Sequence, residues 1–521
     1  MGKRGWIILA AALAVAGAGI GLWRVRGEGP PDLSSCAVLD RPPRIRPDYA
    51  DVVIPPNIAP LNFVVGEPGT RFHVRIAGEG GPGIEVTSRG PCIRIPLRPW
   101  KALLGRNRGR DITVDVAVRD GDGRWARFQT VTNRIAEEEI DPYLSYRLIN
   151  SAFFWSGHWL DMCMVQRNIE TFDRSTIFRS DSFKENVCVN CHMCQRNDAS
   201  LMVMQLRGQF GSGMLLVRDG RVTRLDSRVK GGGGIVSLVA LHPHKELAAF
   251  TTLNLGFLPK RAGISREVFQ YASDVGLYRF DTGEFLRVPK LSSPDHVETD
   301  PAWSGDGKWL YYCRTKVQWP RELGEAGEEL PENYREIRYD LMRIAYDPET
   351  GAWGEPETVL SAEQVGKSIV QPSVSPDGRF VVVCMADYGV WPVVRPEADL
   401  YLIDTRTREY RRMACNSDAC ESTHRWSSNG RWMVFMSRRN DGIYNRLYFT
   451  HIDENGRDTK AVELPQKDPL AHESLLKAYS LPHFMTEPMP LTEKELIRAI
   501  YSQSDSPARK APAKEGRRSM Y

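Results

Sequence analysis

The sequence carries little net charge for its size, and this limits the partners it can have. Its 521 residues include 69 Lys and Arg against 65 Asp and Glu, which leaves a formal charge of +4. A protein that binds nucleic acid or a strongly acidic partner usually has a much larger positive excess. We therefore expect no nucleic-acid function.

Several common catalytic arrangements are also missing. No Ser-His-Asp order and no pair of carboxylates stands out from the background of the sequence. The tetraglycine at 231–234 is not followed by Lys-Ser or Lys-Thr, so it does not predict a phosphate-binding loop. The sequence does not indicate a hydrolase or a transferase, and whether the chain is an enzyme at all stays open.

The N-terminal segment has no charged residue from Gly5 to Trp23, and Lys3 and Arg4 precede it. This length fits one membrane-spanning helix, and tryptophans at both ends are typical of interfacial anchors. We predict a signal-anchor over residues 1–26 in the inner membrane, with the rest of the chain on the periplasmic side. A cleaved signal peptide that releases a periplasmic protein is the alternative.

The 44 glycines and 34 prolines favour many tight turns, and hence an all-β chain. Residues 27–49 are rich in proline and arginine and predict a linker. Residues 50–139 contain alternating runs such as "RFHVRIA" and "DITVDVAVRD", separated by turn clusters. They predict a small β-sandwich of fibronectin III or immunoglobulin-like type. An irregular β-extension of the next domain is the alternative.

A repeat follows from about residue 200. The stretches "LHPHKELAAF", "PAWSGDGKWLYY", "PSVSPDGRFVVV" and "HRWSSNGRWMVF" share a frame, and a second strand follows each of them. The Asp-Gly or Asn-Gly step suits a hairpin turn, and a repeat of this kind predicts a β-propeller. We expect about six blades over 200–490, with the ring closed by strands from 140–180 or from the tail. A short helix with Thr492 as N-cap and a disordered basic tail are expected at 491–521.

Between the sandwich and the repeats, the segment 140–199 contains Cys188, Cys191 and His192 in the spacing Cys-x-x-Cys-His. Two thiols three residues apart can each form a thioether with one haem, and the next residue then brings its imidazole to the iron. We predict covalent haem c on Cys188 and Cys191, with His192 as the proximal iron ligand.

Two other interpretations of the cluster remain. A zinc site would need ligands from a second loop, and no Cys-x-x-Cys or His-x-x-x-His pair exists outside the cluster. A structural or redox-active disulfide is also possible for a Cys-x-x-Cys pair in an exported protein. Cys194 could pair with Cys163, and Cys415 with Cys420.

The stretches "IAPLNF", "MVQRNIETFDRSTI", "VCVNCH", "LRGQFGSGMLL" and "LHPHKELAAF" together resemble a family of bacterial exported proteins. These proteins have a TolB-like β-propeller and a cytochrome c type Cys-x-Asn-Cys-His motif before it. The resemblance covers roughly residues 45–485 and implies the fold and the haem site, but no particular reaction.

The residue on the other face of the haem is not fixed by the sequence. Candidates for the distal iron ligand are His242, His424, His158 and Met204, although a structural role is the more ordinary one for each. Arg207 is a candidate partner for a haem propionate.

The favoured hypothesis is thus a membrane-tethered periplasmic c-type cytochrome that transfers single electrons to a redox partner or senses through its haem. The alternatives are a TolB-like propeller scaffold that binds another protein, with a structural Cys cluster, and peroxide-type catalysis at an open haem.

Overall fold

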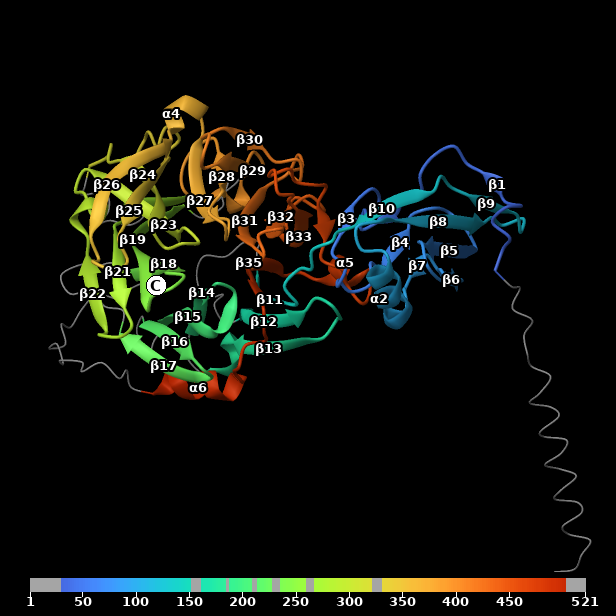
Figure 1. Ribbon diagram of the computed structural model, residues 1–521, viewed down its shortest axis with the longest axis horizontal. Helices are drawn as coiled ribbons and strands as arrows, with labels where there is room; N and C mark the ends of the chain where they lie inside the picture. The colour runs from blue at the N-terminus through green and yellow to red at the C-terminus, as the bar shows by residue number, and fades with distance from the viewer. Residues whose placement is uncertain are drawn as a thin grey trace, which may run out of the picture.

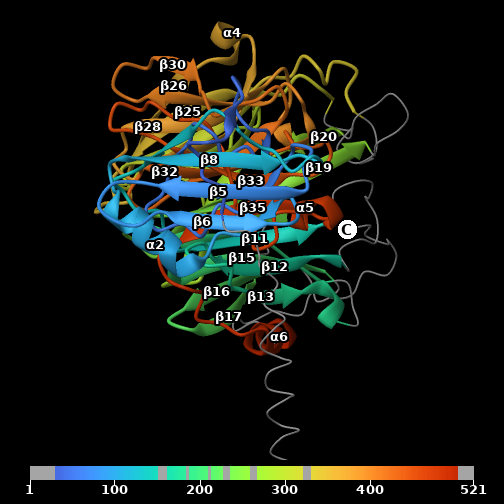
Figure 2. The ribbon, with the colours of Figure 1, turned by 90° about the vertical axis from the view of Figure 1, so that its right-hand side faces the viewer.

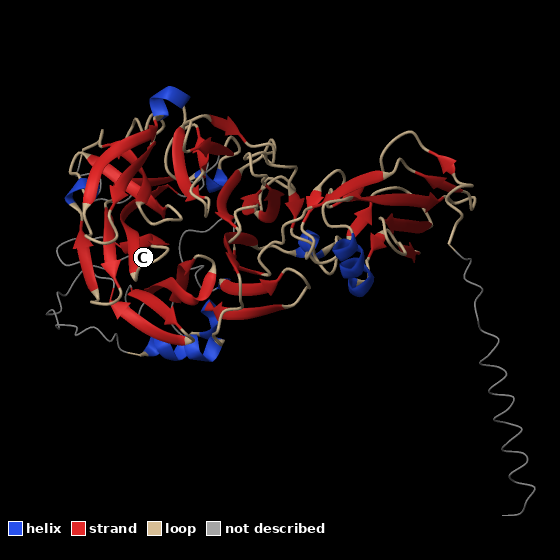
Figure 3. Ribbon diagram, in the orientation of Figure 1, coloured by secondary structure: helices blue, strands red, loops and turns tan. Residues whose placement is uncertain are grey.

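The computed structural model describes residues 30–150, 161–183, 187–208, 213–226, 235–258, 267–320 and 330–502. Strands are far more common than helices in these residues (Figure 3). They form a β-sandwich near the N-terminus and a ring of sheets that follows it (Figure 1). The anchor predicted for 1–26 lies outside the described residues. In the described part, no helix is both long and apolar enough to cross a membrane.

The sandwich consists of a seven-stranded and a three-stranded sheet. The larger sheet comprises β1 (Ala37–Val38), β3 (Val53–Ile54), β5 (Arg71–Ala77), β6 (Ile84–Ser88), β8 (Asp111–Arg119), β9 (Trp125–Arg127) and β10 (Val131–Ile135). The smaller one comprises β2 (Ile45–Arg46), β4 (Phe63–Val65) and β7 (Cys92–Ile93). Alternate residues of β5 and β8 are buried in the shared core, as the period of two predicts.

Two features of this region differ from the sequence-based expectation. Strands β1 and β2 lie inside the segment predicted as a linker. They pair with β9 and β4, so this segment is part of the sandwich. A helix, α2 (Leu97–Arg106), follows β7 where only strands were expected. Its buried residues Trp100, Leu103 and Leu104 have helical spacing, and the Trp100 indole donates a hydrogen bond to the carbonyl of Ile58 (3.0 Å).

Six sheets form the ring, and we number them as blades 1 to 6. Written from the innermost strand outwards, blade 1 contains β35 (Ala478–Met485), β11 (Tyr143–Ile149), β12 (Cys163–Asn168) and β13 (Arg174–Arg179). Blade 2 contains β14 (Val187–Gln195), β15 (Asp198–Gly208), β16 (Gly213–Arg218) and β17 (Arg221–Asp226). Blade 3 contains β18 (Ile235–Leu241), β19 (Leu247–Leu258), β21 (Val275–Arg279) and β22 (Glu284–Arg287), with β20 (Glu267–Ala272) paired to the end of β19.

Blades 4 to 6 follow the same plan. Blade 4 contains β23 (His296–Trp303), β24 (Trp309–Lys316), β25 (Asp340–Tyr346) and β26 (Trp353–Leu360). Blade 5 contains β27 (Ser368–Val374), β28 (Phe380–Ala386), β29 (Asp399–Asp404) and β30 (Tyr410–Arg412). Blade 6 contains β31 (Glu421–Trp426), β32 (Trp432–Ser437), β33 (Arg446–His451) and β34 (Val462–Glu463).

Short helices complete the described part. They are η2 (Ser180–Ser182), η3 (Pro289–Leu291), α4 (Ala362–Val365), η4 (Pro392–Val394), α5 (Ala471–Ser474) and α6 (Glu493–Tyr501). Thr492 caps α6 in a capping box with Glu495, and the helix packs against β13 and β17 with Leu496 and Ile500 buried.

The ring is a closed β-propeller. Each innermost strand contacts the innermost strand of the next blade, and β14 contacts β35. Blade 1 takes β35 from the C-terminal end of the chain and its other three strands from residues 143–179. The two ends of the propeller are therefore held together by backbone hydrogen bonds within one sheet (Figure 1).

The repeated Ser-x-Asp-Gly stretches form the turn between the first and second strands of a blade. In blade 5, the Ser375 hydroxyl donates to Asp377 (2.5 Å) and accepts from the backbone N–H of Phe380 (2.9 Å). Ser304 and Ser427 do the same in blades 4 and 6. Gly378 has φ +72, a conformation that glycine adopts without strain.

The expected boundary at residue 200 falls inside β15, so it does not separate two structural units. Strands β11 to β14, from the segment 140–199, belong to blades 1 and 2. The Cys-x-x-Cys-His stretch lies in β14, so the haem-binding segment predicted for 140–199 is not separate from the propeller blades. The two expected sources of the closing strands, 140–180 and the tail, both contribute to blade 1.

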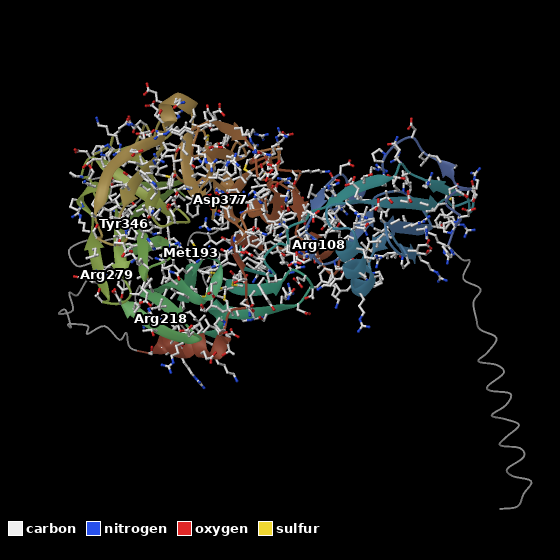
Figure 4. All side chains as sticks on the ribbon, viewed as in Figure 1. Arg108, Met193, Arg218, Arg279, Tyr346 and Asp377 are labelled. Atoms are coloured by element: carbon white, nitrogen blue, oxygen red, sulfur yellow. The ribbon has the colours of Figure 1, made fainter. Side chains whose placement is uncertain are left out.

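The sandwich packs against blade 6 and the start of blade 1 (Figure 2). The Trp432 indole donates to the carbonyl of Glu138 (3.0 Å). The Asp141 carboxylate accepts from the backbone N–H of Ser428 and from the Asn197 amide, both at 2.8 Å. On the sandwich side, Arg108 pairs with Glu139 near this junction (Figure 4).

We expect Phe484→Ala to destabilise the protein by about 3–5 kcal/mol, because a large aromatic side chain leaves a cavity where the ring closes. Phe484 is fully buried in β35 and stacks on Phe449 of blade 6 with ring centroids 5.9 Å apart. The midpoint of urea unfolding, followed by tryptophan fluorescence, measures the change. The exposed Tyr410→Ala is the control, and equal midpoints for the two variants would contradict the expectation.

Candidate functional site

All six innermost strands shift register at an equivalent point, and β14 shifts once more between Cys194 and Gln195. The equivalent shifts lie between Asn190 and Met193 in β14 and between the corresponding residues of the other five strands. The first residue of the shifted pair has a positive φ in five of the strands: Leu238, Asp300, Gln371, Thr423 and Leu481. Because a positive φ is uncommon for these residue types, the bulge is a specific feature of this propeller.

Cys191 and His192 occupy the two bulge positions of β14. The second position, which His192 fills, is taken by Pro301, Pro372 and His424 in blades 4, 5 and 6. The Cys-x-x-Cys-His stretch thus follows the same backbone path as strands that have no such motif. Figure 4 labels Met193, the residue after His192, on the inner side of the ring.

His192 is buried with 4% of its surface exposed. Its Nε2 lies 2.7 Å from the Ser145 hydroxyl, which itself donates to the carbonyl of His483 (3.3 Å). Nε2 is therefore the donor, and Nδ1 has no hydrogen-bond partner among the described residues. Burial lowers the pKa of His192 to about 3, with Arg147 and Arg425 acting in the same direction.

His483, which the sequence analysis did not single out, lies beside His192 on β35. The two ring centroids are 6.1 Å apart in an edge-to-face arrangement. His483 accepts the backbone N–H of Cys194 at its Nε2 (3.3 Å), and its buried Nδ1 has no partner within the described ranges. Burial, with His192 and Arg425 nearby, lowers the pKa of His483 well below its usual value. Only ring closure brings these residues together.

Haem attachment requires space around the Cys188 thiol, so its neighbours decide whether haem fits. Cys188 is 2% exposed, and its Sγ lies 3.9 Å from the Met162 sulfur. It belongs to an apolar cluster with Ile177, Phe178 and Met204 between blades 1 and 2. The side chain of Cys191 lies outside the described part of the structure.

A porphyrin does not fit this arrangement. Its vinyl groups would have to reach a Cys188 thiol that core side chains enclose. Its iron would have to reach an imidazole whose Nε2 already binds Ser145 and whose Nδ1 is closed off from solvent. Since both groups are packed into the interior, covalent attachment requires β14 to leave the conformation described here.

Two of the distal-ligand candidates use a ring nitrogen to join blades. His242 accepts the backbone N–H groups of His244 and Lys245 at Nδ1 and donates to the carbonyl of Gly307 (3.1 Å). A Cβ at Gly307 would lie 2.4 Å from this imidazole, so glycine is required there. His424 is fully buried and donates to the carbonyl of Val382 (2.9 Å).

Burial lowers the pKa of His242 to about 4 and that of His424 to about 3. Both imidazoles are neutral at pH 7 and serve as hydrogen-bonding groups between or within blades.

The other sequence-based candidates lie elsewhere. Met204 is fully buried in the apolar cluster that also holds Cys188. The Arg207 guanidinium donates to the Ser237 hydroxyl (3.1 Å) across the boundary of blades 2 and 3. His158 lies outside the described residues. The pairs suggested for disulfides, Cys163 with Cys194 and Cys415 with Cys420, are thiols in this structure.

Polar side chains connect neighbouring bulges around the centre of the ring. The Asp300 carboxylate accepts the backbone N–H of Gln371 (3.1 Å), and the Gln371 amide oxygen accepts that of Thr423 (2.8 Å). Burial raises the pKa of Asp300 to about 6, while the bond from Gln371 and the charge of Arg425 oppose the rise. These contacts fix the positions of adjacent blades.

No family model and no curated protein matches this chain. Among solved structures, it is similar to an auxiliary nutrient binding protein from Bacteroides thetaiotaomicron, with 12% identity and a TM-score of 0.34. That match covers 81% of this chain and 99% of the other.

An oligogalacturonate lyase from Vibrio parahaemolyticus gives 13% identity and a TM-score of 0.31, covering 67% of this chain and 87% of the lyase. A chain of a nidogen/laminin complex gives 8% and 0.35, covering 66% of this chain and all of that one. At these TM-scores we draw no conclusion about function from the likenesses.

We expect His192→Gln to make the protein less sensitive to acid. The folded-state pKa of His192 lies below that of an unfolded histidine, so the unfolded state binds more protons between about pH 6.5 and 3. Wild-type stability therefore falls as the pH drops through this window, by up to about 1.4 kcal/mol per pH unit from this residue. Gln keeps a donor for Ser145 and removes the titration.

The measurement is the free energy of unfolding in urea at several pH values between 7 and 4. His244→Gln, at an exposed site, is the matched control and should keep the wild-type slope. An unchanged slope in His192→Gln would show that His192 does not titrate in this way.

Proposed function

We propose that this protein is a β-propeller scaffold that binds a folded protein partner through one end of the ring. We call this end the loop face. It carries the connections between the second and third strands of each blade and between successive blades. Trp391, Ile443 and Leu476, from three such connections, are 36%, 50% and 70% exposed.

The strand order supports placing these three residues at the same end. Trp391 lies between β28 and β29, Ile443 between β32 and β33, and Leu476 between β34 and β35. In an antiparallel blade, alternate connections lie at the same end of the sheet. Half of the large exposed apolar residues of the described chain thus belong to the loop face of blades 5 and 6 and the link to blade 1. Exposed apolar groups of this kind favour protein–protein contact.

The backbone beneath these side chains is held in place. The Arg446 guanidinium donates to the carbonyls of Lys477, His472 and Leu475, which surround Leu476. The Asp441 carboxylate accepts the backbone N–H of Ile443 (2.8 Å). A surface that is already ordered loses less conformational entropy when a partner binds.

A membrane-tethered periplasmic location belongs to the same proposal. It is supported by the uncharged stretch at 5–23 and by the basic residues before it. A scaffold held at the membrane in this way would present its loop face to proteins of the envelope.

The haem-based electron carrier or sensor remains our second proposal, because the Cys-x-x-Cys-His spacing is the sequence feature that favours it. The buried Cys188 and the hydrogen-bonded His192 favour the scaffold, in which this stretch is part of the propeller. Peroxide-type catalysis depends on the same haem.

The scaffold proposal is tested by placing a photocrosslinking amino acid at Leu476 or at Ile443 in the full-length protein within its native envelope. We expect one adduct of defined mass from both positions. The triple variant W391S/I443S/L476S should lose the adduct from a crosslinker at a neighbouring loop-face position, while its unfolding temperature stays unchanged.

Tyr410, which is 40% exposed on the outer strand β30, gives the matched control position. The absence of an adduct at the loop face, or the same adduct from Tyr410, would contradict the proposal.

Intact-mass analysis and the reduced absorption spectrum distinguish the two proposals. When the protein is produced with a working haem-attachment system, we expect a colourless product with the mass of the polypeptide alone. Cys188→Ser should then look like the wild type. One added haem that Cys188→Ser abolishes would instead establish the cytochrome and show that β14 changes conformation to accept it.

A further inference from the structure

A cleft of about 600 Å³ opens where blade 4 reaches the loop face. It is lined by Pro294, Asp295, His296, Lys316, Val317 and Trp319. His296 begins β23 and Lys316 ends β24, and the two residues face each other in register. The cleft therefore leads onto one face of blade 4.

The same face of the blade continues inwards with charged residues. Glu298 and Arg314 form the next pair of this register on that face, two residues deeper than His296 and Lys316. Tyr312 follows Arg314 on this face and packs with Val275 and Leu277, which belong to blade 3. The row of side chains thus runs from the cleft into the boundary between blades 3 and 4.

Arg314 and Lys316 are the two cations of this row, and Asp340 of β25 lies opposite Arg314 in the strand register. Arg314 is half-buried and Lys316 is exposed, and neither makes a hydrogen bond or an ion pair with another described residue. Glu298 stands directly opposite Arg314, yet no hydrogen bond or ion pair joins them in the described structure, and the Glu298 Oε2 has no hydrogen-bond partner among the described residues. A carboxyl group and a guanidinium that face each other without a hydrogen bond between them can each bind a third group.

Further buried polar atoms around this row lack partners in the described part of the chain. They are the hydroxyls of Tyr312, Ser292 and Thr251, whose residues are 0%, 6% and 0% exposed. Thr251 lies opposite Val275 in the register of blade 3 and shares its face towards blade 4. A buried hydroxyl without a partner is unfavourable, so several in one region favour a polar occupant.

A protonated Glu298 allows an anion to bind next to it. Burial, with the charge of Asp274, raises the pKa of Glu298 to about 8, while Arg314 acts in the opposite direction. Asp274 itself is paired with Arg287 of β22 (3.3 Å). At pH 7 the Glu298 carboxyl is mostly protonated, and it donates a hydrogen bond instead of repelling a carboxylate.

We propose that this cleft binds a small hydroxylated carboxylate, such as a sugar acid, between blades 3 and 4. The carboxylate pairs with Lys316 and Arg314. A hydroxyl group of the ligand bonds to Glu298, the next residue inwards from His296 on this face; Tyr312, Ser292 and Thr251 lie deeper and do not line the cleft. A guanidinium is suited to a carboxylate because it offers two parallel donors.

Isothermal titration of the purified full-length protein with D-glucuronate and with D-glucose tests the proposal, since the two sugars differ only in the carboxylate. We expect D-glucuronate to bind at least about tenfold more tightly than D-glucose, and Arg314→Leu to weaken D-glucuronate about tenfold or more. Arg218→Leu removes an exposed ion pair between Arg218 of blade 2 and Glu246 of blade 3, and this variant should bind as the wild type does.

A second variant, Glu298→Gln, tests whether the proton on Glu298 contributes to binding. Glu298→Gln keeps a neutral donor, so its affinity for D-glucuronate should persist at pH 9. The wild type should bind less tightly there, because Glu298 loses its proton as the pH rises through about 8. Near-UV circular dichroism should be unchanged in both variants.

Equal affinity for the two sugars, no binding of D-glucuronate, or unchanged affinity in Arg314→Leu would overturn the proposal. An equal decline of Glu298→Gln and wild type between pH 7 and pH 9 would do so as well. The site is independent of the scaffold proposal: W391S/I443S/L476S should bind D-glucuronate as the wild type does.

Discussion

The pairing of β35 with β11 holds the propeller together. These strands come from opposite ends of the repeat region, and their backbone hydrogen bonds make blade 1 continuous with blade 6. Joining them closes a loop of more than 300 residues, which costs conformational entropy that only the packing of the completed ring can offset. Phe484 and Tyr479 of β35 lie in the same apolar core as residues of the sandwich and of blade 6. The closing strand therefore links three parts of the molecule.

The common bulge of the innermost strands follows from the same closure. Six strands converge around one axis, and the bulge lets each backbone turn there while neighbouring blades exchange hydrogen bonds. Asp300, Gln371 and Thr423 form such a series. In blade 2, Cys191 and His192 occupy the equivalent positions. The Cys-x-x-Cys-His spacing is typical of a haem-attachment motif. In this conformation the stretch forms the bulge of one of the six innermost strands.

Some buried polar groups have atoms without a hydrogen-bond partner among the described residues. His192 and His483 each leave one nitrogen without a partner, and Glu298 and Tyr312 each leave one oxygen, among the residues described. The imidazoles are enclosed by blades 1 and 2, whereas the row with Glu298 leads to an open cleft lined by His296 and Lys316. The open cleft beside Glu298 is why the second group carries a ligand proposal. The exposed apolar residues of the loop face, Trp391, Ile443 and Leu476, lie on other blades than the cleft.

The sequence alone indicated the all-β class, the repeated Ser-x-Asp-Gly turns and a propeller, because these depend on contacts between residues close in the chain. It placed Thr492 at the start of a helix for the same reason. Local pattern left open whether strands from 140–180 or from the tail close the ring, and the structure uses both. It could not show that Pro96 precedes a helix or that Cys188 lies in a core strand. Nor could it pair His192 with His483 or align Arg314 with Glu298. Those relations join residues that are distant in sequence, and only ring closure and strand register bring them together.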